Sequence, residues 1–132
     1  MEDIKRCCNF CISEVRQILY GLMRIRKYVN EIKDEMITGD VPATNISTIM
    51  KMIVEELEAI RDYLSSADER ADDELIAMFW RIVKEIIKMI LELQTKLIID
   101  YLNFERKDIF SVQTIDVINR LEKFLDSLFP KS

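Results

Sequence analysis

Hydrophobic side chains recur at alternating intervals of four and three residues along the first 36 residues of the chain. No charged residue interrupts the pattern, whose members are Ile4, Cys8, Cys11, Val15, Ile18, Leu22, Ile25, Val29, Ile32 and Met36. An apolar repeat of 3.5 residues held this long is typical of helices that pack along their whole length. We therefore predict a first helix from about residue 3 to residue 38, about 50 Å long at ~1.5 Å of rise per residue.

A second long helix is predicted from about residue 68 to residue 103, after a capping-box pattern at Ser66–Glu69. One set of its apolar residues keeps the same spacing, namely Ile76, Phe79, Val83, Ile86, Ile90, Leu93 and Leu97. Another set lies beside it, namely Leu75, Ile82, Met89, Leu91, Ile98, Ile99 and Leu102. A helix that is apolar over most of its circumference is buried on most sides. We expect the other helices, or these together with a second subunit, to cover it.

Two shorter helices complete the predicted set. One begins with Thr44 or Asn45 as its N-cap and ends near Ser65–Ser66. The other begins with Ser111 as its N-cap and runs to about Leu128, because a serine side chain readily accepts a hydrogen bond from the first helical turn. We call a stripe of apolar residues at alternating intervals of four and three a seam. The seam of the helix that begins at Thr44 or Asn45 is Ile46, Met50, Ile53, Leu57, Ile60, Leu64 and Ala67.

These elements predict an all-α fold, an up-and-down four-helix bundle with two long helices and two shorter ones. Residues 1–132 are expected to form a single helical domain, which is a usual size for one. Only two glycines and two prolines occur, too few for the many turns of a β-sandwich. Gly21, inside the first helix, indicates a close crossing with another helix.

Histidine is absent from the chain, which bears directly on function. Its absence removes the commonest general base, the Ser-His and Cys-His nucleophile pairs, and the Glu-x-x-His ligands of di-iron bundles. No glycine-rich loop exists to hold a nucleotide phosphate. We therefore expect a protein that is not an enzyme and that has no cofactor.

Three cysteines lie within five residues of one another, and they are the one cluster that suggests a metal site. Cys7, Cys8 and Cys11 provide three thiol ligands, to which another residue would have to be added. Structural zinc sites usually combine two spaced pairs on loops, and a cysteine on an apolar seam commonly serves as a small buried side chain. We favour the latter interpretation and expect no metal.

Charge is unevenly distributed along the acidic chain, whose net charge is −5. Residues 34–80 carry three basic and twelve acidic groups, whereas residues 1–33 carry seven basic and four acidic groups. The acidic block is interpreted as a solvated helix surface, with docking of a basic partner as the alternative. Direct binding of nucleic acid is conceivable through the basic residues of the long helices but is not favoured at this net charge.

One short stretch resembles a known family. Phe79–Met89 is similar to the long helix of archaeal GINS replication proteins, over less than a tenth of the chain, although the family's Arg-x-x-Lys-Ile step and Asp-Phe-Tyr stretch are missing. The resemblance implies an accessory subunit of a replication complex. The alternative function is therefore an accessory subunit of a nucleic-acid-processing complex, of replication or CRISPR type. A virus-encoded helical regulator is a further alternative, because such proteins also contain a central helix that is apolar on most sides.

The hypothesis that we favour is a non-enzymatic α-helical interaction module, self-associating as a homodimer or bound to a helical protein partner. The chain has no secretory signal and no apolar run long enough to span a membrane, so a cytoplasmic location is expected. The residues expected at the interface are Ile4, Cys8, Cys11, Val15, Leu22, Val29 and Trp80.

Overall fold

The structure is a computed structural model that describes residues 2–38, 43–66, 74–105 and 109–129, with only the backbone described for residues 2–12, 43, 44 and 66. Four helices lie in these ranges: α1 (Glu2–Thr38), α2 (Ala43–Ser66), α3 (Glu74–Asn103) and α4 (Val112–Leu128). No strand occurs in the same ranges. The predicted all-α fold is therefore confirmed.

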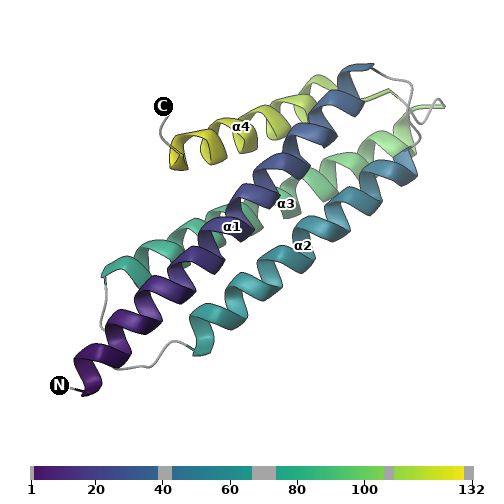
Figure 1. The fold of residues 1–132 in the computed structure, drawn as a ribbon. Helices are drawn as coiled ribbons and strands as arrows, with labels where there is room; N and C mark the ends of the chain where they lie inside the picture. The colour runs from purple at the N-terminus through teal and green to yellow at the C-terminus, as the bar shows by residue number, and fades with distance from the viewer. Residues whose placement is uncertain (1, 39–42, 67–73, 106–108, 130–132) are drawn as a thin grey trace.

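The helices run alternately up and down and form a four-helix bundle (Figure 1). α1 packs against α2 and α4, and α3 packs against the same two helices, so α1 and α3 lie diagonally opposite each other. α4, with 17 residues, is much shorter than α1, with 37. It covers only the end of the bundle where α1 finishes, and the other end consists of α1, α2 and α3 (Figure 1).

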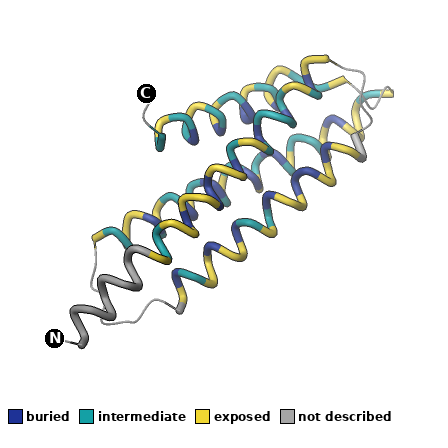
Figure 2. Tube along the Cα trace, in the orientation of Figure 1, coloured by how far each residue is buried: buried dark blue, intermediate teal, exposed yellow. Residues whose placement is uncertain are grey.

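The predicted seams form the core of this bundle. In α1 every seam residue from Ile18 to Met36 is buried, and in α2 the same holds from Ile46 to Leu64. Figure 2 shows these buried positions as stripes that face the inside of the bundle. The seam of α3 is buried from Phe79 to Leu93, so the apolar spacing correctly identified the inner side of each long helix.

The prediction that α2 begins with Thr44 or Asn45 as its N-cap is wrong. The helix already includes Ala43, which places both residues in its first turn. The Asn45 side-chain amide donates instead to Glu35 Oε1 of α1, at 2.6 Å. Asn45 therefore connects two helices where a capping residue was expected. Residues 68–73 of the predicted third helix, with its capping box, lie outside the described residues.

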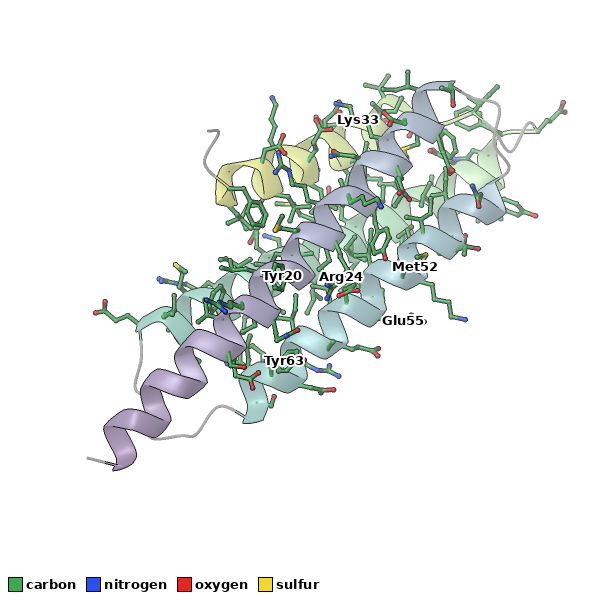
Figure 3. All side chains as sticks on the ribbon, in the orientation of Figure 1. Tyr20, Arg24, Lys33, Met52, Glu55 and Tyr63 are labelled. Carbon is green, nitrogen blue, oxygen red and sulfur yellow. The ribbon has the colours of Figure 1, made fainter. Side chains whose placement is uncertain are left out.

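α1 and α2 approach each other closely at Gly21, as its position in the sequence predicted. A Cβ atom added to Gly21 would lie 3.0 Å from Cδ1 and 3.1 Å from Cγ1 of Ile60 on α2. Three residues further along α1, Arg24 Nε donates to Glu56 Oε1 at 2.8 Å, and Figure 3 labels Arg24 where α1 runs beside α2. The pKa of Arg24 is raised, mainly by this hydrogen bond to Glu56.

α4 is joined to α1 by two ion pairs. Arg26 Nε contacts Asp126 Oδ1 at 2.8 Å, and Lys33 Nζ contacts Glu122 Oε1 at 2.7 Å. Both pairs are only partly exposed, so solvent weakens them less than it weakens a fully exposed pair. The Arg26 guanidinium also lies 5.6 Å from the centre of the Phe129 ring, within the range of a cation–π contact.

Candidate interaction surface

A row of apolar side chains stands out from the bundle along the side of α3 that is nearer to α2. Leu91, Ile98 and Leu102 expose 57%, 61% and 75% of their surface. With Ile87 and Tyr101 they form what we call the α3 ridge. The other described helices cover the inner stripe of α3 but leave Leu91, Ile98 and Leu102 largely exposed, so they do not by themselves bury α3 on most sides. Cover by a second subunit, the other part of the expectation, stays a prediction.

A groove runs between the α3 ridge and α2. Its wider part is a cavity of about 600 Å³ and its narrower part a cavity of about 270 Å³, and the two share the lining residues Val54 and Gln94. Core side chains form the floor, notably Met50, Leu57 and Ile90. The groove is therefore a continuous depression whose bottom is the outside of the hydrophobic core.

The two walls of the groove differ in chemistry. The α3 wall is apolar, since it consists largely of the ridge. The α2 wall carries Lys51, Glu58 and Arg61, which include both signs of charge, and its short side chains Ser47 and Val54 leave space open toward α3. An apolar centre with a polar edge is the usual composition of a surface that binds another protein.

The wide end of the groove is closed by the connection between α3 and α4, through Ile109 and Phe110. Asp100 fixes this connection: its Oδ2 accepts from the backbone N–H of Ser111 at 2.9 Å and from Thr114 Oγ1 at 2.5 Å. The Ser111 side chain in turn accepts from the backbone N–H of Thr114, which confirms Ser111 as the N-cap of α4.

Asp100 is buried. Its carboxylate lies at the N-terminus of α4, where the helix dipole favours a negative charge. Because its Oδ2 is already hydrogen-bonded to two donors, Asp100 shapes the groove end and is poorly placed to bind a ligand there.

The residues that the sequence predicted at an interface do not lie on the α3 ridge, and several of them are buried inside the bundle. Leu22 and Val29 lie in the core, Val15 is half-buried against it, and Trp80 is half-buried and also packs against the core. The side chains of Ile4, Cys8 and Cys11 lie outside the part of the chain that the structure describes. The α1 seam packs against helices of its own chain over its described length, because its spacing specifies a partner helix but not the chain that supplies it.

The possible metal site also depends on side chains that the structure does not describe, those of Cys7, Cys8 and Cys11. Among the residues with described side chains, no group of three histidine, cysteine, aspartate or glutamate residues is placed to hold a metal ion. The neighbouring carboxylates Glu55 and Glu58 are both exposed. Figure 3 shows Glu55 on the outer side of α2, and Glu58 stands at the edge of the groove. They are solvated, as expected.

Of the five basic residues of α1 with described side chains, three are engaged within the bundle. Arg24, Arg26 and Lys33 form ion pairs with α2 and α4, whereas Arg16 and Lys27 are exposed. A row of basic residues that is used for contacts between helices offers few free charges to a phosphate backbone. The structure therefore gives little support to direct binding of nucleic acid through α1.

The sequence already identified Leu91, Ile98 and Leu102 as additional apolar residues of α3, but the regular spacing along this side of the helix was missed. Positions 80, 84, 87, 91, 94, 98 and 101 also follow the alternating spacing of four and three residues. Five of these positions are apolar or aromatic, and the other two are Lys84 and Gln94. A helix with two parallel ladders has two packing faces, and the described residues of this chain bury only one of them.

No protein-family model matches the chain, and neither a curated protein nor a solved structure matches it. Within the described ranges, no helix combines the length and the hydrophobicity that crossing a lipid bilayer requires. The interpretation of the surface therefore rests on its own geometry.

Proposed function

We propose that this protein is a helical protein–protein interaction module, without catalytic chemistry of its own, and that the α3 ridge with the adjoining groove is its docking surface. The observation that supports the proposal is the position of the ridge: a regular apolar ladder is exposed beside a groove whose floor is also apolar. On sequence grounds we place this activity in the cytoplasm.

Exposure of the ridge has an energetic cost that a partner would remove. Fully burying one large aliphatic side chain stabilises by about 1.5–3 kcal/mol relative to leaving it exposed. Leu91, Ile98 and Leu102 are each more than half exposed and lie within three helical turns. Large contiguous apolar patches of this kind on folded proteins commonly mark interaction sites.

The proposal can be tested with a photoreactive side chain in the cell that naturally makes the protein. Leu91, on the ridge, is replaced by p-benzoylphenylalanine, and Met23 on α1, which is similarly exposed at 51%, is replaced in a matched control. We expect irradiation to give one discrete cross-linked species from position 91 and none from position 23. Equal yields from both positions, or no adduct from position 91, would contradict the proposal.

A further inference from the structure

We infer that the occupant of the groove is a second copy of this chain, so that the protein is a two-fold homodimer in which the α3 ridge of each copy enters the groove of the other. This inference rests on the proposed function and names the partner for the same surface. It is carried by four features of that surface, namely the order of ridge and groove, the spacing of the ridge, the area of the face, and the charges along its edge.

Ridge and groove lie side by side on one face, which makes the face complementary to itself. A two-fold axis places the same patch of both copies in contact, so a projecting feature must meet a recess of the same patch. Leu91 and Ile98 project from α3, and the recess begins directly beside them, since both also line the groove. A two-fold rotation can therefore bring each ridge opposite the partner's recess.

The spacing of the ridge suits packing against another helix. Ile87, Leu91, Ile98 and Tyr101 follow the alternating intervals by which side chains of one helix enter the spaces between side chains of the next. Gln94 interrupts the ladder at its middle. A single polar residue on such a ladder commonly restricts the partner and register that a helix accepts, at some loss of stability.

The size of the face favours a second copy over a single guest helix. α2 has 24 residues, so the face of two helices measures about 36 Å by about 20 Å, or roughly 700 Å². A stable protein interface buries about 800 Å² on each partner. One guest helix, about 10 Å wide, would cover half of the face, whereas a copy of the same two helices covers all of it.

The charges at the edge of the face are compatible with two identical copies. Lys51 and Arg61 are basic and Glu58, between them, is acidic. When identical edges of mixed sign approach each other, opposite charges can be placed in register, whereas edges of a single sign would repel. The strongly acidic composition of residues 34–80 is not concentrated on the walls of the groove.

The oligomeric state of the full chain tests the inference, with variants that alter the ridge. Light scattering and sedimentation equilibrium are expected to give twice the chain mass of 15.6 kDa for the wild type. Leu91→Lys and Leu102→Glu are both expected to weaken the dimer by on the order of 30-fold or more, the effect of losing one central contact. Met23→Lys, an exposed change on α1, is the control that should remain dimeric.

Each outcome decides the inference. Leu102 is three-quarters exposed, so its variant keeps the fold even if Leu91→Lys does not, and circular dichroism checks both. A wild-type chain that remains at 15.6 kDa at its highest soluble concentration overturns the inference. A dimer that is unaffected by both ridge variants also overturns it, because the dimer then uses another surface.

The photo-cross-linking experiment separates this inference from the proposed function. If the adduct from position 91 contains peptides of this chain only, the second copy is supported. If it contains one other protein, the inference fails while the docking surface stands. If position 91 gives no adduct, both fail.

Discussion

The side of the bundle between α1 and α2 is closed, whereas the side between α2 and α3 is open. On the closed side, Gly21 lets the two helices approach, and Arg24 forms an ion pair with Glu56 across the seam. On the open side, no ion pair between described residues joins α2 to α3, and a groove separates their outer edges. Apolar spacing alone does not show which side of the bundle is closed. Small residues and paired charges beside a seam, such as Gly21 and the Arg24–Glu56 pair, distinguish the closed side from the open one.

The strongest test of this comparison introduces the same substitution on both sides of the molecule. Leu22 is 1% exposed in the core and Leu91 stands on the ridge. Leu22→Asp buries an unpaired carboxylate and is expected to lower the free energy of unfolding by about 5 kcal/mol, enough to unfold a marginally stable domain. Leu91→Asp is expected to cost only about 0.5 kcal/mol, through lower helix propensity. Thermal and urea unfolding followed by circular dichroism measure both.

These measurements use a dilute protein, so that dissociation of a dimer does not contribute to the result. If Leu91→Asp destabilised the isolated chain as much as Leu22→Asp does, the ridge would be a buried face of the monomer. The comparison between an open and a closed side would then be incorrect.

A smaller effect is expected at the closed end of the groove. Asp100→Ala removes the acceptor for Ser111 and Thr114 and should lower the free energy of unfolding by about 2–3 kcal/mol, because buried donors lose their partner. Asp100→Asn keeps one carbonyl oxygen and should cost less. Urea unfolding gives both values.

Asp116→Ala provides the control for Asp100, because Asp116 is an acidic residue of α4 with a 63% exposed side chain. It is expected to change stability by no more than about 0.5 kcal/mol. Equal losses from Asp100→Ala and Asp116→Ala would show that the buried carboxylate does not hold α4 in place.

The smallest effect concerns the close approach on the closed side. Gly21→Ala gains about 1 kcal/mol of helix propensity, but its Cβ would lie 3.0 Å from Cδ1 of the buried Ile60. The crowding should cancel most of that gain. In an Ile60→Ala background both close atoms, Cδ1 and Cγ1, are missing, so Gly21→Ala should be more favourable there by about 1 kcal/mol.

A double-mutant cycle from urea unfolding measures this difference. A coupling energy near zero would mean that Ile60 does not limit the space at Gly21. The glycine would then need another explanation than close packing of α1 on α2.

The inner architecture was predictable from the sequence because each seam has a regular spacing. Every seam residue of α1 from Ile18 to Met36 is buried, and Ser111 caps α4 as expected. The partner of Asp100 was not predictable, because the contact depends on how the connection before α4 turns back toward α3. The start of α2 was misplaced because Asn45 bonds to Glu35, a residue of another helix.

The interaction surface was only half predictable. The sequence shows that α3 has more apolar positions than one inner face needs, among them Leu91 and Ile98. It does not show that α4 packs on the other side of α3 and leaves these positions exposed, since that depends on the order of helices around the bundle. The function proposed for this surface remains a prediction.

The contacts of α4 with α1 also have a consequence for the order of folding. Arg26 and Asp126 are 100 residues apart in the chain, and Lys33 and Glu122 are 89 apart. During synthesis the α1–α2 hairpin emerges whole before α4 exists, and domains begin to fold from the N-terminal side. The surfaces of α1 and α3 that α4 covers therefore remain exposed until the last of the four helices has been made. A ribosome that stalls before residue 122 leaves a three-helix intermediate whose core is open on one side.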